Sequence, residues 1–250
     1  MHDVQTRADN FGFASSCTCP KRFPSRYTLR NVTRKRVLVV ADTVHPYIYR
    51  DAFPSGLEPL DVVLCAGDLP GSYIEFIATR VTCPVVWVHG NHGEEKVKDY
   101  LGNYAPPGGA IAAHGRLVRV AGLTIVGWGG APKYRENGEG MYTGLEARIG
   151  LTRLGPQLWW NERRSGHAVD IMLTHAAPPG PHAGKDFAHR PCKEIGDFMR
   201  RYKPTLLVHG HMHAYDGKQL EYRDECGTRV VNAFGYNVLE VEVSADERAA

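Results

Sequence analysis

Five short apolar runs in this chain each end close to a side chain that can bind a metal ion. The runs are Val37–Val40, Val62–Leu64, Val85–Val88, Ile171–Leu173 and Leu206–Val208. Runs of this length, rich in Val, Leu and Ile, are typical of strands that are buried on both faces of a sheet. Helical or irregular segments separate them, so the pattern predicts βαβ units and a largely parallel sheet.

The second half of the chain predicts a further sheet. Leu117–Val120 and Leu123–Val126 flank the pair Ala121-Gly122, which favours a hairpin and hence a partly antiparallel sheet. We expect two late runs, Thr228–Val231 and Val238–Val243, to complete that second sheet. Helices are expected at Ser72–Arg80, Glu94–Leu101, Gly144–Arg164 with a break at Gly155-Pro156, and Cys192–Tyr202. The fold class is therefore mixed, α/β (α+β).

The polar side chains that follow the five runs form a candidate metal site. They are Asp42, Asp68, Asn91, His175, His211 and His213. Ligands of open α/β sheets gather beyond the carboxyl ends of the strands, so these side chains should converge on one rim. Carboxylate, amide and imidazole groups suit borderline divalent ions better than Ca²⁺. A glycine precedes the polar group at Gly67, Gly90 and Gly210, where we expect tight turns that need freedom in φ.

Length and composition are those of an ordinary globular chain, with 250 residues of which 43% are hydrophobic. Residues 1–36 hold eight Lys or Arg against two acids, so we expect a basic, poorly ordered extension at residues 1–35 ahead of one domain at residues 36–250. No run approaches the roughly 20 apolar residues of a membrane helix, and the first 30 residues lack the apolar block of a secretory signal. We therefore expect a cytoplasmic protein without membrane contact.

The polar blocks together resemble the motifs of the calcineurin-like metallophosphoesterases, from about Arg36 to Val243. The motif order of that family is Asp-x-His, Gly-Asp, Gly-Asn-His-Asp/Glu, His and Gly-His-x-His, and four of the five blocks match it well. The resemblance implies a four-layer αββα sandwich of two mixed β-sheets, with a dinuclear metal site at the rim. It also implies two divalent ions as cofactors, with Mn²⁺ favoured and Zn²⁺ or Fe²⁺ as alternatives.

The same resemblance implies a role for each residue of the site. The first metal site would consist of Asp42, Asp68 and His213, and the second of Asp68, Asn91, His175 and His211, with Asp68 as the bridge. The catalytic histidine of the family corresponds to His92, which would contact the phosphate and protonate the departing oxygen. Two cations about 3.5–4 Å apart clamp phosphate oxygens and lower the pKa of a bound water to about 7, so that hydroxide can attack opposite His92.

Two positions depart from the family pattern. Val44 stands where the second ligand of the first block belongs; either His45 is brought in by a local distortion, or water fills the place, or the first site is weak or empty. Gly93 replaces the acid that orients the catalytic histidine, and Glu94 is the nearest substitute. The segment after Thr174 resembles the pocket loop of one bacterial branch, which makes His182, Lys185 and His189 candidate phosphate contacts; a solvated polar loop is the alternative.

The function implied by the resemblance is hydrolysis of small phosphodiesters, including cyclic nucleotides, or of phosphomonoesters. Diesters are favoured because no cap domain is recognisable, which predicts an open site. A degenerate member that binds metal or nucleotide with little turnover is the alternative that Val44 suggests. His209, His211, His213 and Asp216 suggest a metallo-β-lactamase-like hydrolase as a further alternative. It is disfavoured because the histidine cluster of that fold follows an early strand, whereas here the histidines lie near the C-terminus. Nucleic acid as a partner and the oligomeric state are left open.

Overall fold

The computed structural model describes residues 32–213 and 220–244 of this chain. Most of the basic extension predicted at residues 1–35 lies outside the described part, as does Asp216. The first strand, β1 (Val32–Ala41), begins four residues before the expected domain boundary, because these residues also pair with the last strand. No described helix is both long and apolar enough to cross a membrane.

Five strands form the first sheet, in the order β15–β1–β2–β3–β6. After β1, their bounds are β2 Val62–Cys65, β3 Val85–Trp87, β6 Ile111–Ala112 and β15 Gly235–Ser244. Neighbouring strands run parallel except β1 and β15, which are antiparallel. Strands β2 and β3 are buried throughout, as their continuous apolar sequence predicts.

Six strands form the second sheet, in the order β13–β14–β12–β11–β8–β7. Their bounds are β7 Arg116–Val120, β8 Leu123–Trp128, β11 Ile171–Thr174, β12 Leu206–His209, β13 Glu221–Arg223 and β14 Arg229–Asn232. The hairpin of β7 and β8 is confirmed, and its turn residues Ala121 and Gly122 both have positive φ, 52° and 76°, as a two-residue type I′ turn requires. The four central strands are parallel.

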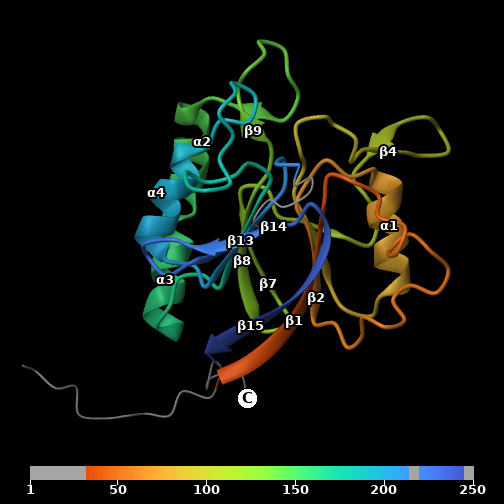
Figure 1. Ribbon diagram of the computed structural model, residues 1–250, viewed down its shortest axis with the longest axis horizontal. Coiled ribbons are helices and arrows are strands. Elements are labelled where there is room, and N and C mark those ends of the chain that lie inside the picture. Colours follow the sequence, from red (N-terminus) through yellow and green to blue (C-terminus); the bar gives the residue numbers. More distant parts are fainter. Residues whose placement is uncertain (1–31, 214–219, 245–250) are drawn as a thin grey trace, which may run out of the picture. The chain divides into compact units, whose positions relative to one another are not determined.

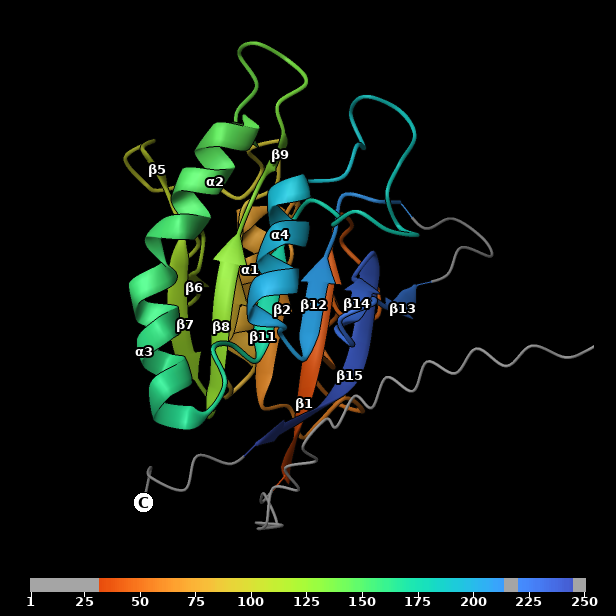
Figure 2. The same cartoon turned by 90° about the vertical axis from the view of Figure 1, so that its left-hand side faces the viewer.

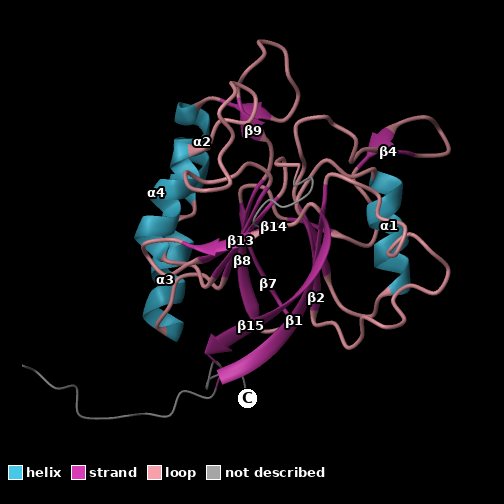
Figure 3. Ribbon diagram, viewed as in Figure 1, coloured by secondary structure: helices cyan, strands magenta, loops and turns pink. Residues whose placement is uncertain are grey.

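Helices cover the outer face of each sheet, which gives the four expected layers (Figures 1 and 3). The helices are α1 Gly71–Arg80, α2 Gly144–Arg153, α3 Gly155–Ser165 and α4 Lys193–Tyr202. Helix α1 packs on the first sheet, whereas α2, α3 and α4 lie over the second, as the turned view in Figure 2 shows. Val39, Leu64, Leu173 and Val208 meet between the sheets and are fully buried.

Two predicted elements are wrong. The run Val238–Val243 lies in β15 and joins the first sheet, because β1 offers it a partner along its whole length. The segment Glu94–Leu101 is not a helix: it contains β4 (Val97–Lys98), which pairs with β5 (Tyr104–Ala105). The Asp99 carboxylate accepts the N–H groups of Leu101 and Asn103, and such a local turn competes with a helix. The short strands β9 (Ala131–Pro132) and β10 (Met141–Tyr142) form another small sheet.

Candidate metal centre

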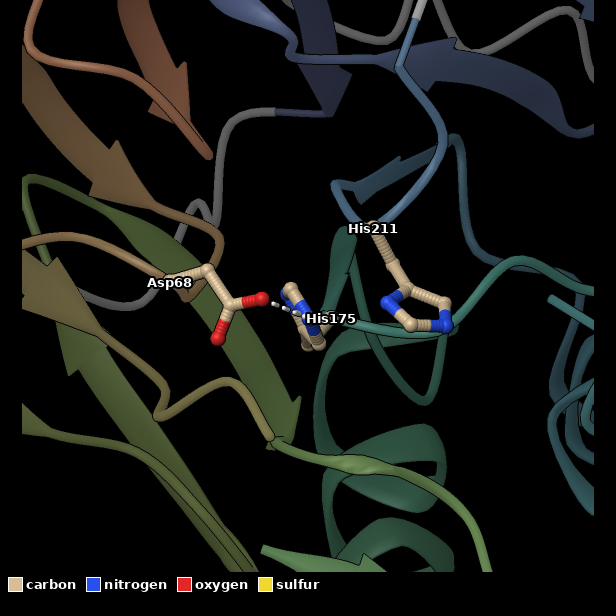
Figure 4. A group of neighbouring side chains, drawn as sticks. All are labelled: Asp68, His175 and His211. Carbon is tan, nitrogen blue, oxygen red and sulfur yellow. Dashed lines mark ion pairs between the residues drawn. The ribbon is translucent and has the colours of Figure 1, made fainter. Parts of the chain in front are cut away.

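The predicted ligands follow strands of both sheets at the same edge of the fold. Asp68 follows β2 in the first sheet, whereas His175 follows β11 and His211 follows β12 in the second. One ligand-type atom from each of these three side chains lies within 4.8 Å of the others (Figure 4). The two sheets therefore bring one carboxylate and two imidazoles together at their shared edge.

Asp68 is the most highly connected side chain of this cluster. Its Oδ1 accepts the backbone N–H groups of Asn91 at 2.9 Å and His92 at 3.1 Å, and its Oδ2 lies 3.2 Å from His175 Nε2. Burial on its own would raise the pKa of Asp68, but the hydrogen bond and charge of His175 outweigh it and hold that pKa at about 2. The carboxylate is therefore charged across the physiological range, as a metal ligand must be.

His175 is fully buried and has a fixed orientation. Its Nδ1 lies 2.8 Å from the carbonyl oxygen of Ala66, so Nδ1 carries a proton and donates it to that oxygen. The other ring nitrogen, Nε2, faces Asp68 and lies 3.0 Å from the Asn91 amide oxygen. Burial opposes a charged ring, yet the hydrogen bond and charge of Asp68 raise the pKa of His175. A divalent ion would replace the Nε2 proton in this arrangement.

Asp42 contacts His211 but lies outside the group of three, and this contact supports a cation site there. Asp42 Oδ1 accepts the His211 N–H at 2.8 Å, whereas Asp42 Oδ2 is buried without a hydrogen-bond partner among the described residues. Burial raises the pKa of Asp42, and burial lowers the pKa of His211 to about 4, so the imidazole is neutral at pH 7 and able to bind a metal. A buried oxygen without a partner is costly, and an ion would satisfy it.

The two remaining predicted ligands, Asn91 and His213, differ in how close they lie to this cluster. Asn91 is only 2% exposed and its Oδ1 faces His175, so it lies directly against the centre. His213 is exposed, and its ring lies 5.2 Å from that of Phe234. His213 therefore lies outside the group of three.

Three of the candidate ligands have a left-handed backbone, which side chains other than glycine rarely adopt. The φ angles are 65° at Asp42, 50° at Asp68 and 63° at His211. Each such residue costs energy that the surrounding fold must compensate, and such residues cluster at functional sites. Gly67 has φ 90°, as expected, but Gly90 is required for space instead: a Cβ there would lie 1.9 Å from Asp68 Oδ1.

Glu95, which the sequence analysis did not single out, binds the backbone of two loops that carry candidate ligands. Its buried carboxylate accepts the N–H groups of Asp68, at 2.9 Å, and of Gly90, and burial raises the pKa of this carboxyl. Glu94, the expected substitute for the missing acid, is exposed. The acid nearest to His92 in the sequence is therefore a surface residue, and the next one holds the backbone of two ligand loops.

His92 lies at the solvent side of the cluster. Its side chain is 54% exposed and its Nε2 lies 3.7 Å from Asp68 Oδ2. Val44 is 40% exposed, and His45 does not replace it in the cluster of ligand atoms. The His45 ring instead contacts Tyr236 at 4.5 Å, and its Nδ1 accepts the N–H of Tyr47 at 3.1 Å.

The predicted phosphate-binding loop divides into an inner and an outer part. His182 is buried, with its Nδ1 2.8 Å from His209 Nε2, and Lys185 is exposed. His189 is held by Asp186 at 2.9 Å and its ring lies 4.9 Å from that of His211. Of the three predicted contacts, His189 is the one that the structure places beside the metal cluster.

Comparisons with known proteins identify the family and agree with the fold. The family described as calcineurin-like phosphoesterase matches residues 35–215. Two solved structures align with 85% of this chain and 100% of their own, one at 14% identity with a TM-score of 0.57 and the other, TT1561 of Thermus thermophilus, at 15% identity with a TM-score of 0.54. At these identities, the similarity to the two structures shows a shared fold and nothing further. No curated protein matches the chain.

Proposed function

We infer the function from one established premise: this chain belongs to the calcineurin-like phosphoesterase family. The fold of the family, a sandwich of two mixed sheets, is the fold of this chain. One observation carries the functional inference, namely the convergence of Asp68, His175 and His211 within 4.8 Å at the strand ends. We conclude that the protein hydrolyses phosphoesters with the help of divalent metal ions.

We propose that the centre holds two ions, Mn²⁺ in preference to Zn²⁺ or Fe²⁺. The first site comprises Asp42, Asp68 and His213, and the second comprises Asp68, Asn91, His175 and His211. Two oxygens support this assignment: Asp42 Oδ2, which is buried without a partner among the described residues, and Asp68 Oδ2, which lies 3.2 Å from His175 Nε2. Divalent ions bound there would clamp the phosphate oxygens and lower the pKa of a bound water.

We propose His92 as the general acid. Asp68 Oδ1 fixes the His92 backbone N–H, while the exposed ring reaches toward the side from which a substrate arrives. From there Nε2 can protonate the departing oxygen of the ester. His189, beside His211, is the proposed contact to the phosphate.

We propose small phosphodiesters, cyclic nucleotides among them, as substrates in preference to monoesters. The exposure of His92 supports this preference, because an open site can accept substituents on both sides of a phosphate. A protein that binds metal or nucleotide with little turnover is the second candidate, and Val44 at the rim favours it.

The test is hydrolysis of bis(p-nitrophenyl) phosphate beside a diester with an alkyl leaving group. Chelation should abolish activity and Mn²⁺ should restore it. His92→Ala should lower turnover by about 10²–10⁴-fold, with unchanged metal content and a smaller loss for the better leaving group.

Activity that survives exhaustive chelation contradicts the metal-dependent mechanism. Equal losses for both esters would move His92 from proton transfer to phosphate binding, and metal binding without turnover would establish the second candidate.

A further inference from the structure

The loop between β9 and β10 brings one tyrosine hydroxyl to the candidate metal centre. Tyr134 Oη lies 3.0 Å from Asn91 Nδ2, and this loop lies above β9 in Figure 1. The loop is fixed at both ends: Arg190 donates to the carbonyl oxygen of Lys133, and Glu139 pairs with Lys96 at 2.9 Å. The loop that carries Tyr134 is therefore tied at Lys133 and Glu139 to segments outside the group of three ligands.

The hydrogen bond to Tyr134 anchors the Asn91 amide with its nitrogen away from the metal ligands. An asparagine side chain has an acceptor oxygen and a donor nitrogen, and rotation about its last torsion exchanges them readily. A metal ion binds the oxygen, whereas the N–H groups would repel it. Asn91 Nδ2 donates to Tyr134 while Oδ1 lies 3.0 Å from His175 Nε2, so both ends of the amide have a partner and the side chain is held with its oxygen toward the metal ligands.

The same hydroxyl retains a free donor. A tyrosine hydroxyl has one O–H donor and lone pairs that accept hydrogen bonds. Tyr134 accepts from Asn91 and from Arg135 Nη2 at 3.3 Å, and no described residue accepts its O–H. The Arg135 guanidinium lies 5.1 Å from the centre of the Tyr134 ring and is exposed. An unused donor beside a cation is suited to an anion such as a phosphate oxygen.

We propose that Tyr134 is a further residue of the phosphoester site: it holds the Asn91 oxygen toward the metal ion and donates a hydrogen bond from its hydroxyl to the substrate phosphate. Arg135 adds positive charge to the same contact. The phosphate part of this proposal rests on the proposed function, whereas the orientation of Asn91 requires only that the centre binds a metal.

Tyr134→Phe removes this hydroxyl and keeps the ring. Calorimetric titration with Mn²⁺, without substrate, should show weaker binding by the 10–100-fold typical of residues that orient metal ligands. Titration of the Mn²⁺-saturated protein with inorganic phosphate should show about tenfold weaker binding. Tyr104→Phe, which removes an exposed hydroxyl from strand β5, is the matched control and should leave both affinities unchanged.

Arg135→Gln separates the two roles of the hydroxyl. This variant should weaken phosphate binding several-fold and leave Mn²⁺ affinity unchanged, since Arg135 makes no contact with Asn91. Wild-type affinities for both Mn²⁺ and phosphate in Tyr134→Phe would overturn the proposal even if the protein hydrolyses phosphoesters. If the wild-type protein shows no phosphoesterase activity and Tyr134→Phe still loses Mn²⁺ affinity, the orientation of Asn91 would be supported and the proposed function refuted.

Discussion

Val44 occupies the position where the family pattern has a histidine that would complete the proposed first metal site. Its side chain is 40% exposed, so a larger side chain can be placed there without displacing the core. Val44→His should tighten the weaker of two Mn²⁺ binding steps by about 10–100-fold, the effect that even supporting residues have on metal affinity. Calorimetry on both proteins measures this change as a convergence of the two dissociation constants.

His45→Ala is the control for this experiment. The His45 ring packs on Tyr236 and its Nδ1 is already occupied by the N–H of Tyr47, so the variant should retain both Mn²⁺ affinities. If the variant loses the first ion, then His45 is a ligand after a shift of the backbone. If it binds two ions with equal affinity, then Val44 does not weaken the first site at all.

At the scale of elements, the loops after β2 and β3 depend on one buried carboxylate. Glu95 accepts N–H groups from both loops, at Asp68 and at Gly90. Glu95→Ala should destabilise the protein by about 1–3 kcal/mol for each unsatisfied buried N–H. It should also weaken Mn²⁺ binding, because Asp68 loses its fixed position. Urea unfolding with a chelator present and Mn²⁺ titration measure the two effects.

Two variants separate this role from a general effect on the loop. Glu95→Gln retains an acceptor oxygen, so it should lie closer to the wild type in both measurements. Glu94→Ala changes the exposed neighbour and should change neither. If Glu94→Ala were as damaging as Glu95→Ala, or if Glu95→Ala kept full Mn²⁺ affinity, the connection between the two loops would not matter for the centre.

At the scale of the whole molecule, the sequence predicted what depends on local pattern. Continuous apolar runs such as Val62–Leu64 indicated buried strands, and polar groups after those strands indicated side chains that meet at one edge of the fold. The sheet that Val238–Val243 joins depends on a partner some two hundred residues away, which periodicity cannot reveal. The burial of Glu95, and the contact of Tyr134 with Asn91, arise only when separate loops meet in the folded chain.

The two sheets each contribute candidate ligands to the proposed centre, so an ion bound there should join them and stabilise the fold. Asp68 comes from the first sheet and His175 from the second. A ligand that binds only the folded state stabilises it by about 2.7 kcal/mol when its free concentration is about 100 times Kd. Thermal unfolding should therefore move to higher temperature with Mn²⁺ than with a chelator.

Asp68→Asn tests whether this stabilisation comes from the proposed centre. The change is nearly isosteric but removes the charge that the ion needs, so most of the Mn²⁺-dependent rise should disappear. Asp61→Asn is a matched control at the other end of β2, where Asp61 pairs with Lys35 at 3.0 Å and accepts the N–H of Arg36. It should lower the unfolding temperature of the metal-free protein and keep the full rise with Mn²⁺. Equal rises in wild type and Asp68→Asn would mean that Mn²⁺ stabilises the chain elsewhere, and the centre would not connect the two sheets.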